Sequence, residues 1–163
     1  MSKFNSLILV LVFILISCGG QEKKQEEGFS YKRTATPTTE SKTETKLASN
    51  IINLTDKGVG PIKSLTLSDK IDSKMVAHGK EVYDKMCVAC HRSDKKFIGS
   101  APKNILKRRT PEWVMNMILN PEEMLKVNPL AKDLLKEFDG TPMINQGLTE
   151  DDARAVLEYF RTL

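Results

Sequence analysis

Two cysteines and a histidine lie together near the middle of the chain, in the sequence Cys87-Val88-Ala89-Cys90-His91. Thiols three positions apart share one helical turn, so each can add to a vinyl group of the same haem. The adjacent histidine then faces the iron. The motif therefore predicts covalent attachment of one haem c through Cys87 and Cys90, with His91 as an iron ligand.

A helix is predicted to lead into this motif from about Asp72, which is suited to be its N-cap. Its apolar side recurs at spacings of three and four residues, in Val76, Gly79, Val82, Tyr83 and Met86. Gly79 costs a helix about 1 kcal/mol relative to alanine, so it indicates a close crossing with another helix. His78 lies off the apolar stripe and is predicted to be a solvated surface residue.

Three further helices are predicted after the motif, and no β-sheet. One begins at Thr110-Pro111 and ends before Pro121, because threonine caps a helix and proline suits its first position. Another begins at Asn128-Pro129 and ends at Gly140. The last opens at Thr149. The segment is therefore predicted to be all-helical.

Residues from about Lys74 to Leu163 resemble the class I (monohaem) cytochromes c. The resemblance rests on a helix running into Cys-x-x-Cys-His, a middle helix, a loop that bears methionine, and a C-terminal helix. It implies an all-α cytochrome c fold of four to five short helices around one covalently bound haem c. It also implies that Gly79 and Tyr83 lie where the first and last helices cross, facing Val156 and Tyr159.

The resemblance also implies that His91 is the proximal iron ligand and Met143 the distal one. Seven methionines are present, but those in or beside helical segments are more commonly core residues that fill gaps. Met143 follows Pro142 in a loop between helices, where a thioether can reach across the haem from a rigid backbone. Met117 is the second candidate.

Family members usually carry Gly-Pro soon after the haem motif, and the proline carbonyl accepts the proximal imidazole proton. Here the matching residues are Gly99 and Ser100, and Pro102 is displaced. Some carbonyl must still orient His91, because outer-shell hydrogen bonds fix the tautomer of a ligating imidazole. The sequence leaves open which carbonyl does so.

Two interpretations also stay open for Trp113, the only tryptophan, and its neighbours Arg108 and Arg109. These side chains could hydrogen-bond a haem propionate. Alternatively, the indole is a core residue beside two solvated arginines.

The N-terminal residues 1–17 have the pattern of a signal peptide, with Lys3 before the apolar block Leu7–Ile16. The sequence Leu-Ile-Ser before Cys18 resembles a bacterial lipobox, which predicts a diacylglycerol on the Cys18 thiol. An ordinary signal peptide or an uncleaved anchor are the alternatives. We therefore expect an exported lipoprotein, anchored to a membrane and facing the periplasm or the cell exterior.

The 163 residues have room for one compact domain with appendages. Residues 18–50 are rich in Lys, Glu, Thr and Ser and almost free of apolar residues after Gln21, which predicts a disordered tether that follows the lipidated cysteine. Residues 51–70 are predicted to be an irregular extension packed on the domain. The cytochrome c domain is expected over residues 71–163.

Charge is distributed unevenly over the predicted domain. Residues 92–109 carry seven basic side chains and one acidic one, a balance of +6, whereas residues 110–163 carry five basic and ten acidic ones, a balance of −5. We expect the basic end near the haem to steer the protein to acidic partners. Nucleic acid is not expected as a partner, because the net charge is only +4 and the chain carries an export signal.

Methionine and histidine together would fill both axial positions of the iron and leave no site for a substrate. The predicted function is therefore one-electron transfer rather than enzyme catalysis. The segments 107–121 and 148–163 look similar to small cytochromes of anaerobic respiration. Expected partners are redox proteins of a respiratory or denitrification chain, with nitrous oxide reductase and a terminal oxidase as candidates.

A haem-based gas sensor or a peroxidase-like haem protein is the main alternative, and it requires an open iron position. A zinc site has too few ligands, because only His91 and His78 accompany the two motif cysteines. A thiol oxidoreductase would be expected beside a βαβ pattern, which the sequence lacks.

Overall fold

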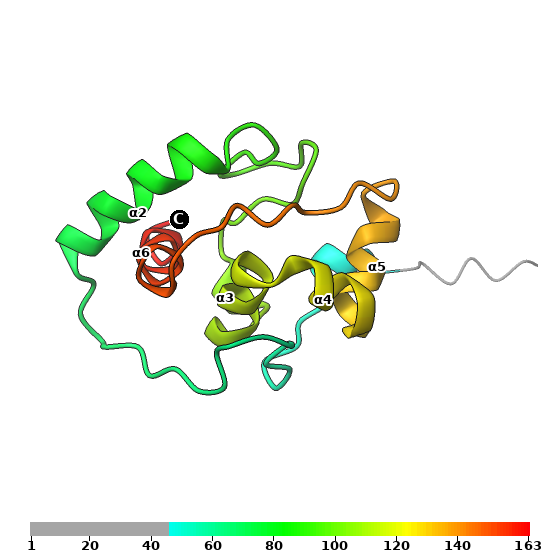
Figure 1. The fold of residues 1–163 in the computed structure, drawn as a ribbon, viewed down its shortest axis with the longest axis horizontal. Helices are drawn as coiled ribbons and strands as arrows, with labels where there is room; N and C mark the ends of the chain where they lie inside the picture. The colour runs from blue at the N-terminus through cyan, green and yellow to red at the C-terminus, as the bar shows by residue number, and fades with distance from the viewer. Residues whose placement is uncertain (1–45) are drawn as a thin grey trace, which may run out of the picture. The chain divides into compact units, whose positions relative to one another are not determined.

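The computed structural model describes residues 46–163, and their regular structure is helical (Figure 1). Residues 46–163 contain no β-strand, only one isolated parallel β-bridge between Asn53 and Arg109. The predicted all-α fold is confirmed. The helices are η1 (Ala48–Asn50), α2 (Ser73–Met86), η2 (Ile105–Lys107), α3 (Pro111–Leu119), α4 (Pro121–Val127), α5 (Pro129–Glu137) and α6 (Glu150–Phe160).

Side-chain caps explain where most of these helices begin. The hydroxyl of Thr110 accepts the backbone N–H of Trp113 at the start of α3, and Asn128 caps α5 in the same way. Thr149 and Asp152 form a reciprocal capping box at α6. The sequence did not predict α4. Pro121 ends α3 and is also the first residue of α4, which is a position where its missing N–H costs nothing.

Helices α2 and α6 cross at Gly79. A methyl group on this residue would lie 1.9 Å from the carbonyl oxygen of Ala155, so only glycine allows this approach. One turn further on, the Tyr83 ring packs against Tyr159 and Phe160, with ring centroids 5.5 and 5.8 Å apart. The crossing thus has the position that the family resemblance implies, and it fixes the end of α2 that leads into the haem motif.

Ionic contacts support the same crossing. The buried carboxylate of Glu158 accepts hydrogen bonds from Arg154 at 2.6 Å, Arg161 at 2.8 Å and the backbone N–H of Asp72 at 3.0 Å. Burial raises the pKa of Glu158, but these three donors outweigh it and the net pKa is lowered. The carboxylate therefore stays charged at neutral pH and ties the start of α2 to the end of α6.

The irregular segment before α2 packs on the domain through buried polar side chains. Asn116 of α3 accepts the N–H of Ile62 at 2.9 Å, and its amide donates to the carbonyls of Lys57 at 2.9 Å and Ile62 at 2.8 Å. Glu112 accepts the N–H of Leu65 at 3.1 Å. These contacts replace backbone pairing for a chain segment that has no helix of its own.

Residues 48–50, which the sequence assigns to the end of the tether, contact the domain in the structure. Ala48 is buried, and both the N–H and the hydroxyl of Ser49 donate to the Glu137 carboxylate, at 2.7 and 2.6 Å. This short stretch can pack on the domain because it combines a small apolar residue with hydrogen-bond donors.

The predicted signal peptide, the Cys18 lipidation site and the rest of the tether lie outside the described residues. Among the helices of residues 46–163, none has both the length and the apolar character needed to cross a membrane.

Candidate functional site

The two motif cysteines lie on the turn that ends α2. The Cys87 N–H still donates to the Tyr83 carbonyl at 2.9 Å, and the N–H groups of Cys90 and His91 both donate to the Cys87 carbonyl, at 3.1 and 2.9 Å. Neither thiol is part of a disulfide. Burial, with a smaller contribution from Cys90, raises the pKa of the Cys87 thiol to about 11. The turn therefore presents two thiols and an imidazole to one cavity.

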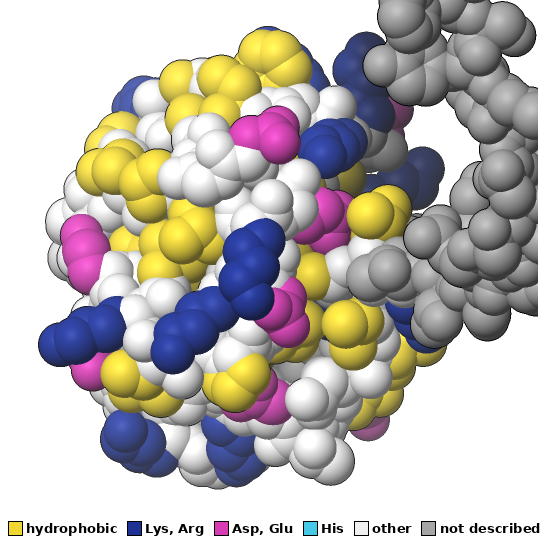
Figure 2. Space-filling model, turned by 90° about the vertical axis from the view of Figure 1, so that its right-hand side faces the viewer, with side chains coloured by type: hydrophobic (Ala, Val, Ile, Leu, Met, Phe, Trp, Pro, Cys, Tyr) yellow, Lys and Arg dark blue, Asp and Glu magenta, His cyan; other side chains and the backbone are white. Residues whose placement is uncertain are grey.

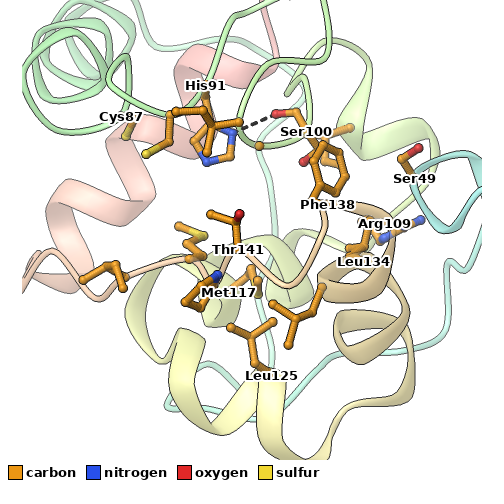
Figure 3. Close-up of a pocket in the computed structure, with 18 of the residues that line it drawn as sticks. Ser49, Cys87, His91, Ser100, Arg109, Met117, Leu125, Leu134, Phe138 and Thr141 are labelled. Atoms are coloured by element: carbon orange, nitrogen blue, oxygen red, sulfur yellow. Dashed lines mark hydrogen bonds between the residues drawn. The ribbon is translucent and has the colours of Figure 1, made fainter.

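The imidazole of His91 is oriented by the backbone carbonyl of Ser100. Its Nδ1 donates to this carbonyl across 2.8 Å, as the dashed line in Figure 3 shows. This bond fixes the proton on Nδ1 and leaves Nε2 free to bind a metal. Ser100 therefore supplies the carbonyl that the sequence left open.

Gly99 packs closely against the same ring. A methyl group on it would approach Cε1 of His91 to 2.5 Å and Nδ1 to 2.8 Å. The Gly99 N–H also donates to the Cys90 carbonyl at 2.8 Å. This hydrogen bond connects the loop that contains Gly99 and Ser100 to the haem motif. The loop thus fixes the ring both by contact and by hydrogen bonding.

A mainly apolar cavity of about 160 Å³ opens beside the motif and is partly open to solvent. A second cavity shares His91, Met117 and Met143 with it. The apolar lining of the first includes Ile105, Leu125, Leu134, Leu135 and Phe138. Figure 3 shows Leu125, Leu134 and Phe138 in this lining.

Both candidate methionines line these cavities. Met143 lies in the irregular segment between α5 and α6, and its side chain is half-buried between exposed neighbours. Met117 projects from α3 and is also half-buried. Leu119 of α3 holds the methionine segment through its carbonyl, which accepts the Asn145 amide at 3.3 Å.

The three candidate propionate-binding residues differ in whether they have an unpaired hydrogen-bond donor. All three line the cavity. The indole N–H of Trp113 already donates to Asn128 at 3.3 Å. By contrast, Arg108 and Arg109 each have a buried Nε with no hydrogen-bond partner. Two unpartnered cationic donors fit an anionic group in the cavity, which is what the carboxylates of a haem provide.

One polar residue of the lining was not predicted from the sequence. Ser49 faces the cavity from η1, which lies within the predicted tether. In the sequence, only the adjacent apolar residues Leu47 and Ala48 distinguish η1 from the rest of the predicted tether.

The sequence model of the cytochrome c family matches residues 76–163. This chain belongs to the cytochrome c family. It carries one covalently bound haem c, and Cys87 and Cys90 are present at the cavity where such a group would attach. The two thiols, the free imidazole nitrogen, the apolar walls and the unpartnered arginine donors of the cavity all fit this group.

Solved structures extend the similarity beyond the family match. A cytochrome c from Rhodothermus marinus is 40% identical to this cytochrome c and has a TM-score of 0.61, with 71% of this chain and 92% of that chain covered. An engineered form of that protein, bound to a carbene intermediate, is also 40% identical, covers 71% and 93%, and has a TM-score of 0.59. No curated protein matches the chain.

The structural match also includes part of the extension. It covers 71% of the 163 residues, which is more than the 54% that residues 76–163 represent. Part of the segment before Val76 therefore has a counterpart in the Rhodothermus marinus cytochrome.

Substituting Gly99→Ala should disturb His91, because the added methyl would overlap the imidazole. We expect the free energy of unfolding to fall by about 1–3 kcal/mol, the usual cost of overpacking, together with a shifted midpoint potential. Ser100→Ala is the matched control, since it keeps the carbonyl that accepts the Nδ1 proton. Redox titration and denaturant unfolding of both variants would test this, and wild-type values for Gly99→Ala would contradict it.

Proposed function

We propose that this cytochrome c is a one-electron carrier whose iron is bound by His91 and Met143. Bound haem supplies an iron that exchanges one electron between its ferric and ferrous states. The observation that carries the proposal is that an imidazole with a free Nε2 and a thioether from a different segment line the same cavity.

The protein's own groups orient the histidine ligand, raise the reduction potential and exclude water from the haem. Ser100 holds the His91 tautomer, so Nε2 stays available in both oxidation states. The Met143 thioether is a soft ligand that favours the ferrous state and raises the potential. The apolar lining excludes water, which reduces the solvent reorganisation that accompanies electron transfer.

Removing the thioether tests this assignment. Met143→Ala should abolish the weak red absorption of the ferric protein, lower the midpoint potential and allow the ferrous protein to bind carbon monoxide rapidly. Met117→Leu should leave all three properties unchanged. If Met117→Leu loses the red band instead, Met117 is the ligand.

An open iron position is the second candidate, and it would suit a gas sensor or a peroxidase-like protein. Met143 lies outside any helix, and the engineered Rhodothermus marinus cytochrome is described with a carbene intermediate bound. This alternative predicts rapid carbon monoxide binding to the unmodified protein and no red band. The same spectra therefore separate a closed carrier from an open haem protein.

A docking surface for redox partners should surround the mouth of the cavity. Three exposed apolar side chains, Met86, Ile98 and Ile144, also line the cavity. Exposed Lys95, Lys96, Lys103 and Lys107 belong to the segment with a charge balance of +6. Figure 2 shows one face of the molecule, on which lysine and arginine side chains lie beside exposed apolar ones. An acidic partner with an apolar centre fits such a surface.

This surface predicts a charge-dependent rate. Oxidation of the ferrous protein by ferricyanide, an anion, should slow by about tenfold or more as salt is raised, because screening removes electrostatic steering. Lys95→Glu should slow it at low salt more than Lys132→Glu, which lies on α5 in the acidic part of the sequence. A rate independent of salt, or equal effects of the two substitutions, would contradict a basic docking surface.

We propose that the protein is exported and anchored by a diacylglycerol on Cys18. The support is the charged start, the apolar block of residues 7–16 and the Leu-Ile-Ser-Cys sequence. A lipid-anchored carrier suits redox partners of a respiratory or denitrification chain, including nitrous oxide reductase or a terminal oxidase.

The mass of the intact protein tests the anchor. It should equal the chain from Cys18 with one haem and a diacylglycerol, and Cys18→Ser should lack the lipid. A wild-type mass that includes residues 1–17, or that lacks the lipid, would contradict the anchor.

A further inference from the structure

The guanidinium of Arg109 is almost completely buried, with 1% of its surface exposed. Its Nη2 donates to the Ala48 carbonyl at 2.8 Å, and its Nη1 donates to the carbonyls of Ile51 and Arg108. Two of these three acceptors belong to residues 48–53, which we call the N-terminal strap.

All of these acceptors are neutral. Within residues 46–163, no carboxylate lies within 4.0 Å of Arg109 as an ion-pair partner, and its Nε has no hydrogen-bond partner. Burial, and then the nearby charge of Arg108, lower the pKa of Arg109 to about 10, so it remains cationic at neutral pH. A buried cation without a carboxylate is costly unless other groups hold it in place.

The strap is itself fixed to the domain at both ends. Ser49 donates its N–H and hydroxyl to Glu137 at the end of α5, at 2.7 and 2.6 Å. The N–H of Asn53 donates to the Arg108 carbonyl at 2.9 Å. Ser49 and Arg109 both line the haem cavity, and Figure 3 shows them at the same end of it.

We propose that the N-terminal strap is a positioning element that holds the Arg109 charge in the haem cavity and so raises the reduction potential. A fixed positive charge in a poorly hydrated site favours the ferrous state, whose charge is lower by one. Without the strap carbonyls, hydration would draw the guanidinium toward water and weaken this effect. The inference rests on the proposed one-electron function, and it assigns a redox role to residues before the family match.

Substitutions at both ends of this contact test the proposal in the full-length haem protein. Ser49→Pro removes both donors to Glu137 and disfavours the helical backbone of Ala48, whose carbonyl holds Arg109. Arg109→Gln removes the charge. Both should lower the midpoint potential, and Arg109→Gln should shift the ferrous-to-ferric equilibrium by about tenfold, equivalent to 59 mV for one electron. Ser64→Ala, in the exposed part of the extension, is the control and should leave the potential unchanged.

A double-mutant cycle separates positioning from general destabilisation. If the strap acts through Arg109, Ser49→Pro will not lower the potential further in the Arg109→Gln background. Equal and additive effects in both backgrounds would overturn the proposal. If Ser49→Pro does not fold, Ser49→Ala takes its place in the cycle. Amide hydrogen exchange of Asn53 would show whether either substitution loosens the strap.

The red absorption band and carbon monoxide binding keep this test distinct from that of the proposed function. Both should be unchanged in the Ser49 variants, because Met143 is untouched. A lowered potential with an intact red band supports the strap, and an unchanged potential despite faster exchange at Asn53 contradicts it. A wild-type protein that lacks the red band would contradict the axial assignment alone.

Discussion

The hydrogen bond from Nδ1 of His91 to the Ser100 carbonyl is the contact on which the site depends. It determines which imidazole nitrogen is free and toward which cavity it points. Gly99 makes this possible, because any side chain there would occupy the space of the ring. The family more usually obtains this acceptor from a proline; here a serine carbonyl performs the same task, since only the backbone oxygen is needed.

The remaining structure holds this loop and the motif at fixed positions. Helix α2 ends in the motif, and its direction is set where Gly79 meets the backbone of Ala155 on α6. On the other side of the cavity, α3, α5 and the segment that bears Met143 form the wall, and the extension packs behind α3 through Asn116. A domain of this size gains much of its core from its cofactor, so the cavity is also part of what holds it together.

Sequence patterns predicted those features that depend on local chemistry. The cysteine motif, the caps at Thr110, Asn128 and Thr149, and the glycine at the α2–α6 crossing could all be read from residue types and spacing. Features that depend on long-range contacts could not. Residues 48–50 of the strap resembled a tether because the partner of Ser49, Glu137, lies 88 residues away in the sequence. The Ser100 acceptor and the pairing of Trp113 with Asn128 likewise depend on loop positions that only the folded chain defines.

A crystal structure of the ferric protein with its haem would test the central claim most directly. The account predicts thioether bonds at Cys87 and Cys90, with iron bound on one side by Nε2 of His91 and on the other by Sδ of Met143. The Ser100 carbonyl should still accept the Nδ1 proton. An iron with an open sixth position, or one bound by Met117, would contradict the closed electron carrier described above.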